Sequence, residues 1–180
     1  MPKAVLPYPR RGAAASCDPP PPRGRLPAMS APAALVLDLT DLAATEALAA
    51  RVARAARPGD AILLAGPLGA GKSAFARAFL RAAAADPTLE VPSPSYTLVQ
   101  TYDLPPFRAH HFDLWRLAGA ADLAELDWAE ARADVVLVEW PDRLGRLYPA
   151  DALTIDLQLT GAETRRATLS GWGERMEALA

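Results

Sequence analysis

The sequence predicts an α/β fold of three layers, in which helices flank a mostly parallel central sheet. Two short apolar runs, at residues 61–65 and 135–138, have the composition of strands that are covered on both faces. Segments with helical spacing of apolar residues alternate with strand-like segments along the chain. With 51% apolar and 22% charged residues in 180 positions, the chain has enough apolar side chains for one ordinary core.

Capping residues, prolines and changes of apolar spacing mark the ends of the expected elements along the chain. A strand at residues 34–39 precedes a helix that begins after Thr40 or Asp41, both good caps, and stops at Pro58. The run at 61–65 is the central strand, and helical spacing predicts a helix over 72–84. Aromatic and β-branched residues predict strands at 96–102 and 109–115, joined by a proline turn. We further expect short helices within 120–133, strands at 135–138, 153–159 and 166–169, and a last helix over 173–179.

Residues 1–28 differ in kind from the rest of the chain. They carry five basic residues, one acidic residue and eight of the eighteen prolines, without helical or strand periodicity. We expect a disordered leader, with Met29 as the natural start and residues 1–28 as an upstream-start artefact or a flexible tail. A proline-rich ligand and a transit peptide are the alternatives. We expect residues 29–180 to form a single domain.

Charge and cysteine content restrict the partners and the compartment. Residues 29–180 hold 14 basic and 20 acidic residues, so this part is not expected to bind nucleic acid by itself. The single cysteine, Cys17, excludes an intramolecular disulfide and favours a reducing, cytoplasmic location. No apolar run approaches the roughly 20 residues of a membrane-spanning helix, so no membrane contact is expected.

Residues 66–73 read Gly-Pro-Leu-Gly-Ala-Gly-Lys-Ser, which matches the P-loop pattern Gly, four residues, Gly-Lys-Ser/Thr. The motif lies between an expected strand and an expected helix, so it predicts a P-loop NTPase-like fold. Lys72 is expected to reach the β- and γ-phosphates and Ser73 to ligate Mg²⁺. No Asn-Lys-x-Asp signature is present, which favours ATP over GTP. The expected nucleotide-binding residues of this segment are Gly66, Leu68, Gly69, Ala70, Gly71, Lys72, Ser73 and Ala74.

Two carboxylates are candidates for the chemistry beside the phosphates. Glu139 follows the second apolar run and is positioned to hold Mg²⁺ directly or through water, unless it is a solvated strand-end glutamate. Strand alternation places His111 and Asp113 on one face and His110 on the other. We expect Asp113 to bind Mg²⁺ through water or to orient the attacking water, and His111 to be a half-buried strand histidine. A transition-metal site would need a further ligand from elsewhere.

Four motifs together resemble a known family. Besides residues 66–73, they are Pro-Ser-Pro-Ser-Tyr-Thr-Leu-Val at 92–99, His-Phe-Asp-Leu-Trp-Arg at 111–116 and Glu-Trp-Pro at 139–141. In this order they resemble TsaE, formerly YjeE, the small P-loop ATPases of bacterial tRNA threonylcarbamoyladenosine synthesis, over about residues 34–160. The resemblance implies a switch-like loop at 92–99 and a wall formed by Trp140 near the nucleotide. It also implies that Lys72, Asp113 and Glu139 are catalytic, and that Ser73 and Glu139 hold the metal.

The chain departs from the family pattern at three positions. Pro67 stands where an aspartate is frequent, Ala74 where a second hydroxyl is frequent, and Trp115 where tyrosine is usual. The loss of a hydroxyl at Ala74 removes one potential phosphate contact, so turnover is the property expected to change. An indole at position 115 keeps the packing surface of the phenol.

The resemblance implies an ATPase subunit required for threonylcarbamoyladenosine modification of tRNA. ATP hydrolysis would drive or reset a transferase complex of TsaD- and TsaB-like proteins, and tRNA would be reached only through that complex. One alternative is a small-molecule or nucleoside kinase, which needs an acceptor pocket and usually a mobile, arginine-bearing lid. The longest insertion, at 118–133, carries one arginine and many acidic residues, which argues against such a lid. A second alternative is a non-hydrolytic nucleotide-binding module.

Overall fold

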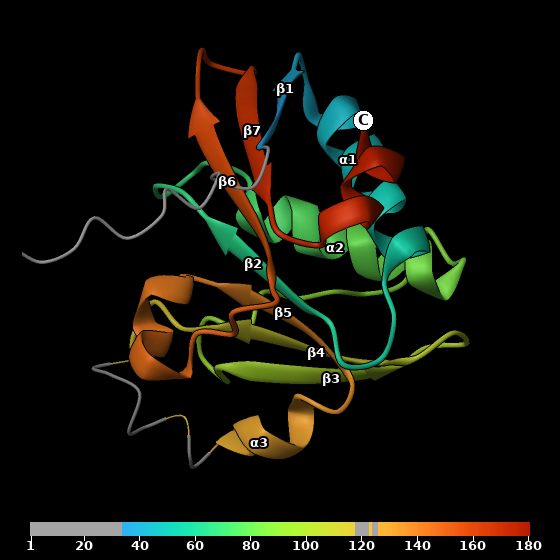
Figure 1. Cartoon of the computed structure of the whole chain (residues 1–180), viewed down its shortest axis with the longest axis vertical. Coiled ribbons are helices and arrows are strands. Elements are labelled where there is room, and N and C mark those ends of the chain that lie inside the picture. Colours follow the sequence, from blue (N-terminus) through green and yellow to red (C-terminus); the bar gives the residue numbers. More distant parts are fainter. Residues whose placement is uncertain (1–33, 118–122, 124–125) are drawn as a thin grey trace, which may run out of the picture. The chain divides into compact units, whose positions relative to one another are not determined.

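The computed structural model describes residues 34–117, 123 and 126–180, and Figure 1 shows their arrangement. The expected disordered leader lies outside these residues. The strands are β1 (Leu35–Leu39), β2 (Ala61–Ala65), β3 (Val99–Asp103), β4 (Arg108–Asp113), β5 (Val135–Glu139), β6 (Leu153–Leu159) and β7 (Arg165–Ser170). The α-helices are α1 (Leu42–Ala55), α2 (Lys72–Ala84) and α3 (Trp128–Ala131), and the 3₁₀ helices are η2 (Pro141–Leu147) and η3 (Gly173–Leu179).

The strands form one sheet in the order β1-β7-β6-β2-β5-β4-β3. The four central strands, β6, β2, β5 and β4, are parallel, while β1, β7 and β3 pair antiparallel at the two edges. Parallel strands bring their carboxyl ends to one edge of a sheet, which is where ligands bind in open α/β sheets. The loops after β2, β4 and β5 therefore meet at this edge.

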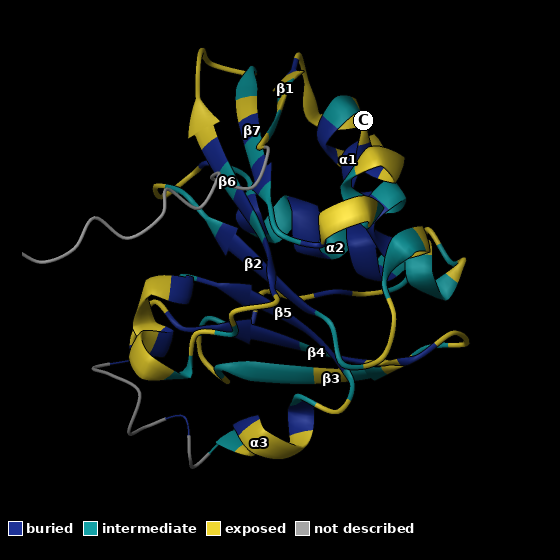
Figure 2. Cartoon of the chain, in the orientation of Figure 1, coloured by how far each residue is buried: buried dark blue, intermediate teal, exposed yellow. Residues whose placement is uncertain are grey.

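Two apolar layers cover the two faces of the sheet. Alternate residues of β2 divide between them: Ile62 and Leu64 pack with α1 and α2, whereas Leu63 packs with α3 and η2. Every residue of β5 is buried, and Figure 2 shows the central strands enclosed between exposed outer helix faces. The predicted α/β class and its three layers are confirmed.

Local signals determine the ends of the two long helices. The Asp41 side chain accepts a hydrogen bond from the backbone N–H of Ala44 at 2.7 Å, which caps α1 as expected. Helix α2 covers the predicted residues 72–84. It ends at Ala85 in the left-handed conformation, where the N–H of Asp86 donates to the carbonyl of Arg81.

The segment before β3 differs from the prediction. A strand was expected from Tyr96, but β3 begins at Val99. The N–H of Leu98 donates to the carbonyl of Pro94 at 2.7 Å, and Leu98 has a φ of +66°. This closed turn takes residues 96–98 out of the sheet despite their strand-forming composition, because a local hydrogen bond outweighs a weak strand propensity.

Three further observations concern the end of one strand and the short helices. Strand β4 ends at Asp113 rather than at 115, because the Asp113 carboxylate accepts from the N–H of Trp115 and turns the chain. Of the helices expected within 120–133, α3 is described, while residues 118–122 and 124–125 lie outside the described part. Helix η2 was not anticipated. None of the described helices combines the length and the apolar composition needed to cross a bilayer.

Candidate functional site

The loop between β2 and α2 depends on glycine at two positions. Gly66 has a φ of +126°, and a Cβ at this position would meet the backbone carbonyl oxygen of Leu157 on β6. Gly71 has a φ of +106° and directly precedes α2. Residues with side chains rarely adopt these conformations, so glycine lets the chain turn tightly from strand to helix. The turn directs the N-terminal N–H groups of α2 toward the loop.

Lys72 lies buried under this loop, with 5% of its surface exposed. Its Nζ donates to the carbonyl oxygens of Gly66 and Pro67, each at 2.8 Å, and lies 3.9 Å from the ring centroid of Trp140. Burial lowers the pKa of Lys72, while the nearby carboxylates of Glu139 and Asp113 act in the opposite direction. Among the described residues, two carbonyl oxygens and an aromatic face hold the ammonium group, and no carboxylate is bonded to it.

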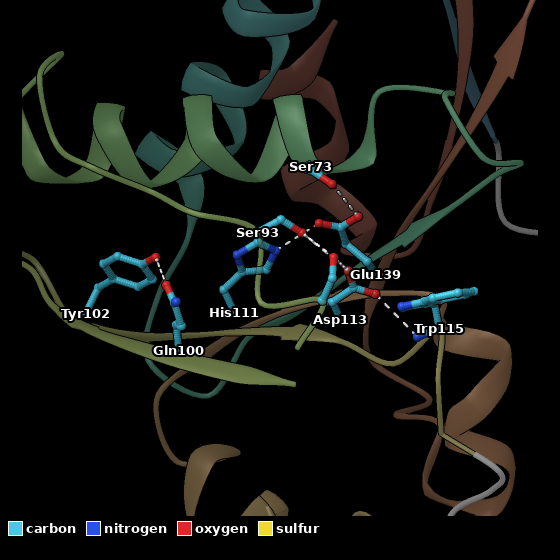
Figure 3. Close-up of polar contacts among 9 residues, drawn as sticks. Ser73, Ser93, Gln100, Tyr102, His111, Asp113, Trp115 and Glu139 are labelled. Carbon is cyan, nitrogen blue, oxygen red and sulfur yellow. Dashed lines mark hydrogen bonds and ion pairs between the residues drawn. The ribbon is translucent and has the colours of Figure 1, made fainter. Parts of the chain in front are cut away.

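Glu139 and Ser73 meet at the end of β5. The hydroxyl of Ser73, in the first turn of α2, donates to Oε2 of Glu139 at 2.9 Å. The other oxygen, Oε1, accepts from Nε2 of His111 at 3.0 Å, and Figure 3 shows both contacts. His111 is only 1% exposed, so the prediction of a half-buried side chain was wrong. The imidazole is enclosed between the sheet and α2, because its ring points inward to Glu139.

Asp113 lies beside Glu139, because the parallel register of β4 and β5 pairs these two residues. Its Oδ2 accepts from the hydroxyl of Ser95 at 2.9 Å and from that of Ser93 at 3.4 Å. The two serine hydroxyls are themselves 2.8 Å apart. Asp113 therefore contacts the loop before β3, whereas Glu139 contacts the start of α2.

One cavity of about 810 Å³ connects these groups. It is lined by Leu68, Gly69, Gly71, Lys72, Ser73, Ala74, Ser95, Tyr96, Asp113, Trp115, Arg116, Glu139 and Trp140. The structure thus brings together most of the predicted site residues, while Gly66 and Ala70 are not among the residues that line the cavity. At its mouth, Leu68 is 84% and Tyr96 89% exposed.

Some neighbours of the site were not assigned from the sequence. The cavity is also lined by Ser95, Tyr96 and Arg116. The motifs at 92–99 and 111–116 contain these residues, but none of them was given an individual role from the sequence. Arg165 in β7 lies outside these motifs. Its Nε donates to the carbonyl of Ala70 in the loop at 3.3 Å, a contact across 95 positions that no local pattern reveals.

The oxygen atoms of Ser73 and Glu139 match the preference of Mg²⁺, which is usually held by one or two carboxylates together with substrate phosphates. Within the described residues, no group of three or more His, Cys, Asp or Glu side chains is arranged as a metal cage. The pair is therefore suited to a metal shared with a phosphate ligand rather than to a metal held by protein atoms alone.

The parallel core, the strand–loop–helix turn and the lysine under the loop define a P-loop-like α/β protein. Residues 39–167 match the family described as threonylcarbamoyl adenosine biosynthesis protein TsaE. The chain belongs to the TsaE family. This confirms the resemblance found in its motifs.

Individual relatives agree with this assignment. A tRNA threonylcarbamoyladenosine biosynthesis protein TsaE of Bacillus subtilis is 33% identical over 135 residues, which cover 75% of this chain and 84% of the relative. The protein of the same name from Rickettsia felis is 31% identical over 126 residues, covering 69% and 73%. The crystal structure of YdiB from Bacillus subtilis superposes with a TM-score of 0.65 at 26% identity, over 82% of this chain and 92% of YdiB.

Proposed function

We propose that this chain is an ATP-binding and ATP-hydrolysing subunit in the biosynthesis of threonylcarbamoyladenosine in tRNA. The observation that carries the proposal is the contact between the Ser73 hydroxyl and the Glu139 carboxylate, in a cavity that Lys72 also lines. Two segments, the start of α2 and the end of β5, contribute these groups. Together they supply what a nucleotide with Mg²⁺ requires: a cation, a hydroxyl and a carboxylate.

Each group has a distinct task in this proposal. The backbone N–H groups of residues 69–73 and the Lys72 ammonium bind phosphate oxygens, and Lys72 exchanges its carbonyl partners for them. Ser73 and Glu139 would hold Mg²⁺, which supplies charge neutralisation at the phosphates when it is bound. Asp113 orients the attacking water or accepts its proton, because its carboxylate lines the same cavity one strand away.

A second cavity gives space for the rest of the nucleotide. It has a volume of about 450 Å³, shares Gly71 and Ala74 with the first cavity, and is bordered by the start of α1 and by Arg165. The two cavities adjoin at Gly71 and Ala74, so a nucleotide with its terminal phosphate near Glu139 and Asp113 would extend its nucleoside half in this direction.

The partners follow from the family and from charge. The acidic balance of residues 29–180 disfavours direct binding to tRNA phosphates. We propose that the chain acts in the cytoplasm on a complex of TsaD- and TsaB-like proteins, that ATP hydrolysis drives or resets this complex, and that tRNA is contacted only through it.

The proposal is tested by measuring phosphate release from ATP by the purified chain, alone and with a TsaB–TsaD complex. We expect slow turnover alone, stimulation by the complex, and loss of turnover in Lys72→Ala, because backbone amides alone do not neutralise the phosphate charge. Retained turnover in Lys72→Ala would contradict the assignment. A kinase would instead transfer phosphate to a small acceptor, so the same assay is run with a panel of such acceptors and scored for phosphorylated product.

A further inference from the structure

His111 is a buried titratable residue to which the proposed mechanism assigns no task. His111 lies in β4, two residues before Asp113. Its ring points to Glu139 (Figure 3). In Figure 3, the imidazole, the Glu139 carboxylate and the Ser73 hydroxyl form a connected series from β4 through β5 to α2.

The direction of the histidine hydrogen bond follows from its partner. A carboxylate oxygen accepts hydrogen bonds, so Nε2 of His111 is the donor in the 3.0 Å contact with Oε1 of Glu139. Ser73 donates to the other oxygen at 2.9 Å. Each carboxylate oxygen thus has one donor, one from α2 and one from β4, and the Glu139 side chain is only 3% exposed.

The second ring nitrogen distinguishes this histidine from a packing residue. Nδ1 of His111 is buried and has no hydrogen-bond partner in the part of the chain that the structure describes. A buried polar atom without a partner is unfavourable, and an apolar side chain of similar size would fill the same space without it. The hydrogen bond donated to Glu139 is what an apolar side chain of the same size would not supply at this position.

We propose that His111 is a positioning residue for the magnesium site: its Nε2–H fixes the orientation of the Glu139 carboxylate so that Oε2 stays beside the Ser73 hydroxyl. His111 does not itself contact the metal. This inference rests on the proposed function, since it concerns the Mg²⁺ of a bound nucleotide. Outer hydrogen-bond partners of metal ligands typically change metal affinity by about 10–100-fold when they are removed.

The test compares three variants with the wild type. His111→Leu removes the donor, His111→Gln keeps an N–H near the position of Nε2, and His110→Leu removes the neighbouring histidine on the other face of β4. His110 is a matched control because its ring contacts Thr101 and Asp134, outside the cavity. Binding of ADP is measured by calorimetry over a series of Mg²⁺ concentrations and in excess EDTA, with thermal unfolding of each variant in parallel.

We expect His111→Leu to raise the Mg²⁺ concentration for half-maximal stimulation of ADP binding by about 10–100-fold, with ADP binding in EDTA unchanged. His111→Gln is expected to restore most of this loss, and His110→Leu to behave as the wild type. A purely structural role would lower the unfolding temperature and both binding modes together, without rescue by glutamine. If His111→Leu does not fold, His111→Asn replaces it, because the shorter amide keeps the polarity but does not reach Glu139.

The outcomes separate the inference from the function on which it rests. Wild-type protein that binds ADP with no response to Mg²⁺ would overturn the proposed function, and the inference with it. A Mg²⁺ response in the wild type that is unchanged in His111→Leu, or that glutamine does not rescue, would overturn the inference alone.

Discussion

At the scale of single residues, the two buried carboxylates of the site are distinguished by their hydrogen-bond donors. Glu139 accepts from Ser73 and His111, so it is connected to the start of α2. Asp113 accepts from Ser93 and Ser95, so it is connected to the loop before β3. Two carboxylates that are neighbours in the sheet are therefore attached to different parts of the site and should respond differently to substitution.

Glu139→Gln is expected to weaken Mg²⁺-dependent ATP binding in a way that added Mg²⁺ partly restores. The amide keeps the shape of the side chain but removes the negative charge that attracts the metal. Titration of Mg²⁺ at fixed ATP, followed by calorimetry, gives the affinity. A loss that no concentration of Mg²⁺ relieves would indicate a structural role for this residue instead.

Asp113→Asn is expected to leave the affinity for Mg·ADP nearly intact and to reduce partner-stimulated ATP turnover by about 10²–10⁴-fold, the usual contribution of a positioned acid or base. The measurement is steady-state phosphate release in the presence of the TsaB–TsaD complex, because slow basal turnover would hide the difference. If this variant turns over ATP at the wild-type rate in the full assembly, Asp113 has a structural role at the strand end and no catalytic role.

At the scale of elements, the site is built from the loops that follow β2, β4 and β5 together with the loop before β3, and only part of this was predictable. Residues 72–84 of α2 were predicted correctly because glycines before the helix and Asp86-Pro87 after it are local signals. The turn at residues 94–98 was missed, since its closing hydrogen bond competes with a strand-forming composition. The Ser73–Glu139 contact joins residues 66 positions apart. The P-loop pattern and the strand-end position of Glu139 predicted a Mg²⁺ role for each residue separately, but no local pattern predicts the contact between them.

The glycines of the loop after β2 give a prediction for this scale. Gly66→Ala would place a Cβ against the backbone carbonyl of Leu157, whereas Gly69→Ala meets no atom within 4 Å. Both positions have positive φ, 126° and 79°, so both alanines are strained, by about 1–2 kcal/mol each. We expect Gly66→Ala to lose about 2 kcal/mol more than Gly69→Ala in free energy of unfolding, because backbone must move to relieve the clash.

Urea denaturation followed by circular dichroism measures this difference, with Gly69→Ala as the control for backbone strain alone. Equal free energies of unfolding for the two variants would show that β6 yields easily to the loop. In that case the close approach of Gly66 to Leu157 would not constrain the shape of the loop.

At the scale of the whole molecule, the sheet has antiparallel strands at both edges, and the chain after β7 returns to pack on α1. The sequence predicted the last helix but not its anchor. Arg175 in η3 donates to both oxygens of Asp60, each at 2.8 Å, and lies 4.1 Å from the ring of Trp172. Asp60 directly precedes β2, so this pair connects the C-terminal segment to the strand that leads into the nucleotide loop.

Two arginine pairs of similar chemistry make this connection testable. The Arg175–Asp60 pair is largely covered, with 28% and 13% of the side chains exposed, while the Arg166–Asp38 pair between β7 and β1 is 52% and 68% exposed. Removing one partner of a covered pair leaves the other charge poorly solvated, whereas exposed pairs contribute little. Arg175→Met should therefore lower the free energy of unfolding by about 1–2 kcal/mol, from the loss of charge-assisted hydrogen bonds.

The matched variant Arg166→Met should leave the urea midpoint unchanged, since water solvates Asp38 when its partner is lost. Both variants are compared with the wild type by urea denaturation at low salt and in 0.5 M NaCl, where screening of exposed charges is strong, with a Debye length of about 4 Å. The destabilisation by Arg175→Met should persist in high salt, because the covered pair is poorly screened. If both variants lose equal stability at low salt and neither does in high salt, then the Arg175–Asp60 pair acts as a screened surface pair, and it does not anchor the C-terminal segment to β2.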